Sequence, residues 1–264
     1  MCGIAGYSLC ARSGVDRTRA AQALLAGIAE RGSDAVGVAS AGPGLPTVTH
    51  KVRGGARAML DSVHVPASAV SALVHVRDYT KGHPSVGENN HPIRHGAVVG
   101  IHNGIIVNDE EIFARDGFDR AHPCMSVDSE AIFALVHRAE SRRRVRVLED
   151  LHGTMAAAWL DERKPDALFL ARGIGRPLWI GSSADGLFFA STRDAFELLE
   201  RYAAVEPIEA SEVPEGTLLT VVGGATERRE RFRPRAFERE APPAVKAPGE
   251  RAFCVLRLAA LAAA

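Results

Sequence analysis

The feature that most constrains the fold is a series of short apolar runs separated by turn residues. Runs of strand length in tandem favour antiparallel pairing between neighbours. Helical spacing of apolar residues predicts helices at 16–31, from near Ser126 through Ala139, and at 193–201. Because strands and helices are grouped rather than alternating, we predict an α+β fold with mostly antiparallel sheets. The strand-like runs are residues 3–9, 35–39, 47–52, 70–76, 97–102, 154–160, 166–171, 177–181, 186–191 and 216–222.

The composition excludes several classes of protein. The 264 residues suit one large domain, or one domain plus an extension. Thirty-two basic residues balance 32 acidic ones, so no net charge predicts binding to nucleic acid or to an anionic membrane. We find no secretory signal and no apolar run that could span a membrane. Four cysteines without a C-x-x-C pair support neither a disulfide scaffold nor a structural zinc site, and we expect a cytoplasmic protein.

The character of the sequence changes near the C-terminal end. Residues 226–239 contain six arginines and three glutamates, and residues 240–250 are rich in proline and alanine. We therefore predict a globular domain at 2–232. Residues 233–264 are predicted to be an Arg/Pro/Ala-rich tail, with a composition compatible with partial disorder.

The N-terminus offers a candidate nucleophile. If Met1 is removed, the thiol of Cys2 lies beside a free α-amine. An ordinary α-amine has a pKa of about 7.7–8.0 and a thiol one of about 8.5, so the amine can accept the thiol proton. Taken alone, a cysteine at position 2 is more often an accident of sequence.

The segment HVRDYTKG at 75–82 follows a predicted strand and begins a polar stretch that extends to residue 96. Loops of this length are usually functional or disordered. Arg77 can contact a carboxylate through two hydrogen bonds, and Thr80 can add a hydroxyl donor. The alternative is a solvated loop with a surface ion pair between Arg77 and Asp78.

Two further sites each have a structural and a chemical interpretation. Asn103-Gly104 between apolar runs is typical of a type I′ hairpin turn, but an Asn103 amide and a Gly104 N–H can also stabilise an oxyanion. Asp128 lies near the start of a predicted helix. It can act there as a cap or first-turn acid, or it can pair with an ammonium group of a ligand.

Together and in this order, these motifs resemble the class II glutamine amidotransferase domain. That domain is the N-terminal nucleophile (Ntn) hydrolase unit of glucosamine-6-phosphate synthase and amidophosphoribosyltransferase. The resemblance covers about residues 2–222 and implies an enzyme with a four-layer αββα sandwich. The matching pieces are MCGIAGY at 1–7, ERGSDAVGVA at 30–39, HVRDYTKG at 75–82, NNHPI at 89–93, HNGIIVN at 102–108, SVDSEAI at 126–132 and RGIGRPLWIG at 172–181.

The resemblance also implies roles for individual residues. Cys2 is the nucleophile, with its α-amine as general base, and Asn103 with Gly104 forms the oxyanion hole. Arg77 and Thr80 hold the α-carboxylate of L-glutamine, while Asp128 and the Gly104 region hold its α-ammonium group. The implied reaction is attack of Cys2 on the γ-carboxamide, release of ammonia and hydrolysis of a glutamyl thioester. It needs neither a metal nor an organic cofactor.

Three positions depart from the family pattern. Asp78 stands where an aromatic residue is usual, Lys81 where histidine or a small residue is common, and Ser33 lies within the segment that resembles RGYD. Because Asp78 and Lys81 belong to the loop that closes over glutamine, we count them among the candidate substrate-binding residues.

The residues after 222 are too few and too biased in composition for an ammonia-consuming domain. We therefore expect either a separate synthase subunit, with the tail as a candidate docking segment, or hydrolysis alone. The alternatives are an amidohydrolase for another γ-glutamyl compound and a catalytically silent glutamine-binding module.

Overall fold

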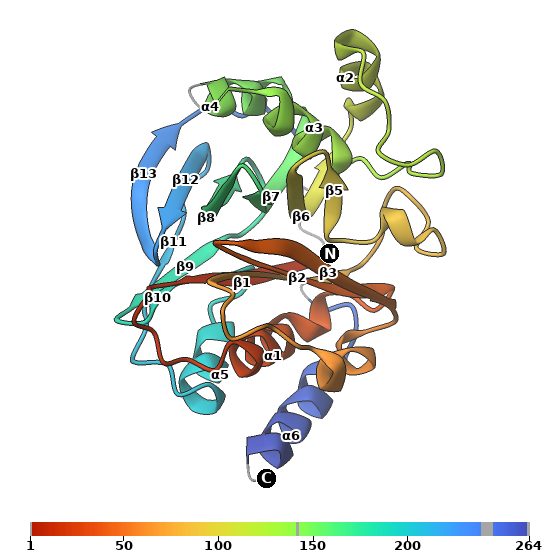
Figure 1. Cartoon of the computed structure of the whole chain (residues 1–264). Coiled ribbons are helices and arrows are strands. Elements are labelled where there is room, and N and C mark those ends of the chain that lie inside the picture. Colours follow the sequence, from red (N-terminus) through yellow and green to blue (C-terminus); the bar gives the residue numbers. More distant parts are fainter. Residues whose placement is uncertain (1, 141–142, 239–244, 263–264) are drawn as a thin grey trace.

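The computed structural model describes residues 2–140, 143–238 and 245–262. Two antiparallel sheets lie face to face, and helices cover the outer face of each (Figure 1). The seven-stranded sheet, called sheet A, has the order β11-β9-β10-β1-β4-β2-β3, and the six-stranded sheet B has the order β13-β12-β8-β7-β6-β5. Sheet A contains β1 Gly3–Leu9, β2 Ala35–Gly42, β3 Leu45–Arg53, β4 Ser71–Arg77, β9 Trp179–Ser183, β10 Gly186–Ala190 and β11 Glu209–Glu212. Sheet B contains β5 Ile93–His95, β6 Val98–Ile106, β7 Gly153–Asp161, β8 Lys164–Arg172, β12 Thr217–Val222 and β13 Ala225–Arg231.

The helices complete a four-layer αββα sandwich. One group packs on sheet A and the other lies on the side of sheet B, with α2 beyond the end of α3 (Figure 1). This confirms the α+β class and the Ntn-hydrolase type of sandwich. On the side of sheet A are α1 Arg17–Ile28, α5 Ala195–Tyr202 and α6 Glu250–Ala262; on the side of sheet B are α2 Asp109–Asp116, α3 Glu130–Arg138 and α4 Arg144–Val147.

Alternation along the strands separates three apolar layers. On β1, Ile4 belongs to the layer between the sheets, whereas Ala5 belongs to the layer between sheet A and its helices. On β6, Ile101 also belongs to the layer between the sheets. Asn103 therefore lies on the face of β6 that looks into this middle layer. Cys2 directly precedes β1 and continues the alternation of that strand toward the same layer, from the opposite sheet.

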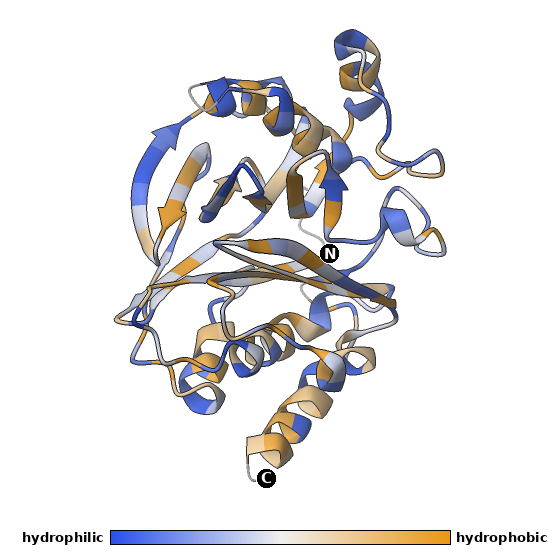
Figure 2. Cartoon of the chain, in the orientation of Figure 1, coloured by the Kyte–Doolittle hydropathy of each residue, from blue (hydrophilic) through white to orange (hydrophobic). Residues whose placement is uncertain are grey.

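The strands that sequence patterning did not predict are short or charged. β5 and β11 have three and four residues, and β13 is formed by part of the Arg/Glu-rich run. β13 is hydrophilic along its length and forms an edge of sheet B (Figure 2). Charged side chains on an edge strand disfavour pairing with other chains. This explains why β13 is charged and lacks the apolar pattern of the other strands.

The interpretation of Asn103-Gly104 as a type I′ turn is wrong. Both residues lie inside β6 and pair with β7, with Gly104 opposite Met155. Gly104 has a φ of 145°, and a Cβ there would lie 1.9 Å from the carbonyl oxygen of Thr154. Glycine is needed here for a close approach of two strands, not for a hairpin.

The helix predicted from near Ser126 begins later, at Glu130. The residues before it bond elsewhere: the N–H groups of Ser126 and Val127 both donate to the side-chain oxygen of Asn89. This segment is therefore tied to the long loop that follows β4.

The predicted tail is partly outside the described residues, at 239–244 and 263–264, so its boundary and its disorder stay predictions. Within the described part, α6 packs against α1 through Cys254 and Leu258, both 0% exposed. Among the described residues, no helix is both long enough and apolar enough to cross a membrane.

Candidate active site

Cys2 lies directly before β1 and is held from two sides. Its thiol donates to the carbonyl oxygen of Asp78 at 3.3 Å, and the N–H of Asp78 donates to the sulfur at 3.5 Å. On the other side, Nε of Arg31 donates to the carbonyl oxygen of Cys2 at 3.0 Å. Burial raises the pKa of the Cys2 thiol above its ordinary value, against the opposing effect of the hydrogen bond from Asp78. The side chain is therefore a thiol at neutral pH and needs a base to become a nucleophile.

A small cavity brings Cys2 together with most of the predicted site residues. Its lining comes from the loop after β4, from β6 and from the turn before α3. These elements are distant in sequence, and the sandwich brings them to one end of the layer between the sheets. The lining residues are Cys2, Arg77, Asp78, Tyr79, Thr80, Lys81, His91, His102, Gly104, Val127, Asp128 and Ser129.

Asn103 precedes Gly104 on β6 and faces the same layer as Cys2. The residue is 1% exposed, and neither its amide oxygen nor its amide nitrogen has a hydrogen-bond partner among the described residues. An unpaired buried amide is costly to a folded protein, and each such group calls for an explanation. The Asn103 amide is explained if it donates a hydrogen bond to a ligand oxygen bound beside Cys2.

Asp128 is neither a cap nor a first-turn acid of α3. It lies before the helix, is 3% exposed, and accepts a hydrogen bond from the N–H of Ile106 at 2.7 Å. Burial raises the pKa of Asp128 to about 6, with that hydrogen bond acting in the opposite direction. A buried carboxylate in the cavity suits a cationic group of a ligand.

Arg77 ends β4 and is buried, so it does not belong to a solvated surface ion pair. Its guanidinium donates to the side-chain oxygen of Asn90 at 2.5 Å, to the carbonyl oxygen of Lys81 at 2.8 Å and to that of Gly82. The hydrogen bonds to Lys81 and Gly82 thus hold the 78–82 loop against the guanidinium of Arg77. Thr80 lies at the exposed tip of this loop and lines the cavity.

The charged side chains of Asp78 and Lys81 have partners in the protein. Nζ of Lys81 bonds both carboxylate oxygens of Asp109, at 2.8 and 2.7 Å, and also Glu110 at 3.1 Å. The carboxylate of Asp78 lies 3.7 Å from Nζ of Lys246. Both residues line the cavity, but these contacts tie their charges to α2 and to the C-terminal segment.

The RGSD segment at 31–34 contributes three contacts that the sequence did not predict. They come from Arg31, Gly32 and Asp34, and they position Cys2 and the start of the loop after β4. Beside Arg31, Asp34 accepts the N–H of Tyr79 at 2.9 Å, and its own N–H donates to the carbonyl oxygen of Arg77. A Cβ on Gly32 would lie 2.4 Å from the backbone of Arg77, so the segment approaches the loop very closely. The resemblance to RGYD marked this segment, but nothing in its residue types indicates these backbone contacts.

Two of the residues that line the cavity are buried histidines, His91 and His102. His102 interacts through Nδ1 with the hydroxyl of Ser129 at 2.8 Å and through Nε2 with the carbonyl oxygen of Thr154 at 3.2 Å. Burial lowers the pKa of His102 to about 4 and that of His91 well below its ordinary value. Both rings are therefore neutral at pH 7 and add no positive charge beside Cys2.

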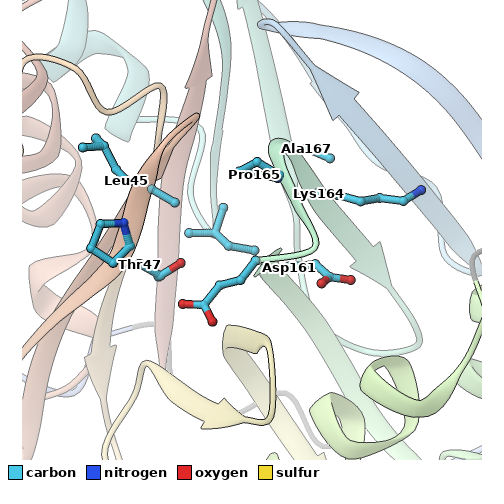
Figure 3. A pocket seen from close by; sticks show the side chains of 10 residues that line it. Leu45, Thr47, Asp161, Lys164, Pro165 and Ala167 are labelled. Atoms are coloured by element: carbon cyan, nitrogen blue, oxygen red, sulfur yellow. The ribbon is translucent and has the colours of Figure 1, made fainter.

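A second cavity, of about 250 Å³, opens between the β2–β3 and β7–β8 turns, where Leu45 and Thr47 face Lys164 and Pro165 (Figure 3). Both of its acids are paired, Asp161 with Arg144 and Arg163, and Glu162 with Arg94. Among the described residues, its lining contributes no buried polar side-chain atom without a hydrogen bond. We therefore place the candidate active site at Cys2. The described residues also contain no group of side chains arranged to hold a metal ion.

Known proteins share both sequence and fold with this chain. A family model described as "Glutamine amidotransferase domain" matches residues 83–198. Glutamine–fructose-6-phosphate aminotransferase of Acidithiobacillus ferridurans is 30% identical over 249 residues, which are 87% of this chain and 38% of that protein. The enzyme of the same name from Photorhabdus laumondii is 28% identical over 83% of this chain and 36% of its own length. The chain thus spans little more than a third of these relatives.

Among solved structures, glutamine phosphoribosylpyrophosphate amidotransferase from B. subtilis matches with a TM-score of 0.69 and 21% identity. The match covers 87% of this chain and 49% of that one, and at this identity it shows the fold alone. Sequence motifs, family match and shared fold all support a class II glutamine amidotransferase domain.

Proposed function

We propose that this chain hydrolyses L-glutamine to glutamate and ammonia through a thioester on Cys2, after removal of Met1. The observation that carries the proposal is the convergence of Cys2, Gly104, Arg77 and Asp128 on one cavity. The Asn103 amide has no hydrogen-bond partner in the described part of the chain, and it lies next to Gly104 on the strand that faces Cys2. Met1 lies outside the described residues, so its removal is part of the proposal.

The first step needs a base, because burial raises the pKa of the Cys2 thiol. The free α-amine of Cys2 accepts the thiol proton, and the sulfur attacks the γ-carboxamide carbon of glutamine. The oxygen of that carboxamide gains negative charge and is stabilised by the Asn103 amide and the Gly104 N–H. When the C–N bond breaks, the proton held by the amine leaves with the nitrogen as ammonia.

The second step regenerates the enzyme. A water molecule gives a proton to the α-amine and attacks the thioester carbon. The C–S bond then breaks, glutamate is released, and the proton returns to the sulfur of Cys2. The same oxyanion hole serves both steps, because both pass through a tetrahedral intermediate.

The two ends of glutamine carry opposite charges, and the cavity offers opposite charges to match. Asp128 binds the α-ammonium group, while Arg77 and Thr80 bind the α-carboxylate. Arg77 already donates to the carbonyls of the 78–82 loop. A carboxylate bound by Arg77 is therefore coupled to the conformation of the loop that covers it.

The fate of the ammonia extends the proposal. The relatives have more than half of their length outside the matched region. We propose that a separate synthase subunit accepts the ammonia in the cytoplasm, and that without this subunit the ammonia is released free. In both cases water hydrolyses the glutamyl thioester. We propose no role for nucleic acid or a membrane at this site.

The test is the stoichiometric release of glutamate and ammonia from glutamine by the purified full chain, alone and with candidate synthase subunits. We expect activity in the parent protein and none in Cys2→Ala. The control is Cys10→Ala, because Cys10 lies at the opposite end of β1. Activity retained in Cys2→Ala would contradict the proposal.

The paired charges of Asp78 and Lys81 give no support to a preference for another γ-glutamyl compound. A comparison of glutamine with γ-glutamyl dipeptides separates these substrates. Glutamine binding without turnover in the presence of every candidate partner would instead favour the silent binding module.

A further inference from the structure

The C-terminal segment that precedes α6 lies beside the nucleophile. The N–H groups of Lys246 and Ala247 both donate to the carbonyl oxygen of Glu30, at 2.7 and 3.0 Å. Gly249 donates to the carboxylate of Glu30 at 3.2 Å. Glu30 belongs to the 3₁₀ turn Ala29–Arg31, and Arg31 of this turn holds the carbonyl oxygen of Cys2. The segment therefore packs on one of the two elements that fix Cys2.

The side chain of Lys246 reaches the other element. Its Nζ lies 3.7 Å from the carboxylate of Asp78, and both side chains are about one-third exposed, at 37% and 30%. The backbone of Asp78 contacts the sulfur of Cys2 through both its N–H and its carbonyl oxygen. One residue of the C-terminal segment thus contacts both the turn behind Cys2 and the loop over it.

The segment is anchored independently of the site. The carboxylate of Glu250 accepts the backbone N–H of Arg57 at 3.1 Å and forms an ion pair with its guanidinium. Further along α6, Cys254 and Leu258 are 0% exposed and belong to the apolar layer that includes α1. These contacts do not involve the 78–82 loop, so they hold Lys246 in place independently of that loop.

We propose that Lys246 is a positioning residue for glutamine hydrolysis: it holds Asp78, and with it the loop 78–82, against Cys2. This inference rests on the proposed function and adds a residue from the C-terminal segment to its site. Asp78 is one of the positions at which this chain departs from the family pattern, and Lys246 supplies the opposite charge. The pair is partly exposed and is screened by salt, so its effect is modest and falls at high ionic strength.

The experiment measures the full-length protein and its Lys246→Ala, Lys246→Arg and Arg257→Ala variants. Arg257→Ala is the matched control, because it removes a surface ion pair of α6 with Asp61 that does not touch the loop. One readout is kcat and KM for glutamine. The other is the rate of alkylation of Cys2 by iodoacetamide and by its N-phenyl derivative, followed on the N-terminal peptide. Both reagents react with the Cys2 thiolate, so the fraction of thiolate cancels in the ratio of the two rates. Because the reagents differ in size, the ratio reports how far the loop covers the sulfur.

For Lys246→Ala we expect KM to rise by about two- to fivefold with little change in kcat, as for the loss of an exposed ion pair. The ratio of bulky to small reagent rates rises by a similar factor. Lys246→Arg restores both values, and Arg257→Ala resembles the parent protein. In an Asp78→Ala background, Lys246→Ala has no further effect on the reagent ratio.

The proposal is overturned if Lys246→Ala leaves the reagent ratio unchanged, if Arg257→Ala raises it equally, or if Lys246→Ala acts as strongly in the Asp78→Ala background. Protection of Cys254 from both reagents verifies that α6 stays docked in every variant. If the parent protein turns over no glutamine, the proposed function fails, whereas the alkylation ratio still tests the contact of Lys246 with the loop. If Lys246→Ala changed the ratio of reagent rates but not the KM for glutamine, Lys246 would affect the loop only in the absence of substrate. That result would contradict its role in hydrolysis.

Discussion

The main-chain N–H of Ile106 donates a 2.7 Å hydrogen bond to the carboxylate of Asp128. This bond joins β6, which carries Asn103 and Gly104, to the turn that precedes α3. It places a buried acid in the cavity of Cys2, and burial raises the pKa of that acid to about 6. The residue assigned to the α-ammonium group of glutamine therefore changes charge just below neutral pH.

The raised pKa of Asp128 predicts the pH dependence of glutamine binding. Only the ionised carboxylate attracts the ammonium group, so affinity is present above pH about 6 and is lost as the pH falls through that value. For a single group, the Kd of glutamine rises about tenfold between pH 7 and pH 5. Calorimetry on the Cys2→Ala variant measures this binding without turnover.

The control for this pH effect is Asp128→Asn, which we expect to bind glutamine weakly and with no pH dependence over the same range. The pH dependence of stability runs in the opposite direction to that of glutamine affinity. A carboxyl group whose pKa is raised on folding destabilises the folded state once it ionises. The free energy of unfolding of the parent protein therefore loses this contribution as the pH rises from about 4 to about 6. A Kd of glutamine that is equal at both pH values would exclude Asp128 as the partner of the ammonium group.

Asn103→Ala separates catalysis from stability. The loss of one oxyanion donor is expected to lower kcat by about 10²–10³-fold, with a smaller change in the Kd of glutamine. Because the Asn103 amide bonds to no described residue, its removal breaks no hydrogen bond within the described part of the fold. Steady-state kinetics and thermal unfolding measure the two effects.

Asn108→Ala is the matched control and should show the reverse pattern. Its amide donates to the carbonyl oxygen of Asp150 and accepts the N–H of His152, outside the residues that line the cavity. We expect a lower melting temperature and an almost unchanged kcat. If Asn103→Ala kept kcat within a few-fold of the parent value, the oxyanion hole would have to be sought elsewhere.

Gly104→Ala is predicted to damage the fold as well as the site. The φ of 145° alone costs an alanine on the order of 1–3 kcal/mol, and the added Cβ would lie 1.9 Å from the carbonyl oxygen of Thr154. Gly14→Ala is the control, since a Cβ there meets nothing within 4 Å. Urea unfolding should show a large loss for Gly104→Ala only, and equal midpoints would refute the close strand contact.

Cys254 should be unreactive in the native protein. Burial raises its pKa to about 12, and its side chain is 0% exposed on the face of α6 that packs against α1. We expect iodoacetamide at pH 8 to label the exposed Cys124 readily and Cys254 only after denaturation. Rapid labelling of Cys254 under native conditions would mean that α6 does not pack on α1.

The sequence predicts most strands well because their apolar runs are continuous. The run at 3–9 coincides with β1, and that at 186–191 exceeds β10 by one residue. β13 escapes prediction because its side chains are exposed and charged, so only backbone pairing with β12 defines it. The Asn103-Gly104 pair misleads because a glycine that allows a close strand approach resembles a glycine in a turn.

The candidate site, like the fold, has parts that local sequence patterns predict and parts that they do not. Each of four site residues is ambiguous alone, and the order of their motifs along the chain is what groups them into one site: Cys2, Arg77, Gly104 and Asp128. The contacts of Arg31 with Cys2 and of Lys246 with Asp78 leave no local trace, since each depends on segments that approach only in three dimensions.

The central claim is that Cys2 is a processed N-terminal nucleophile in a site that accepts glutamine. Intact mass spectrometry of the purified chain, with and without a diazo-ketone analogue of glutamine, tests it most directly. We predict a mass lacking Met1 and a single adduct that maps to Cys2 and disappears when excess glutamine is present. Retention of Met1, or a free Cys2 that stays unlabelled while other cysteines react, would contradict the claim.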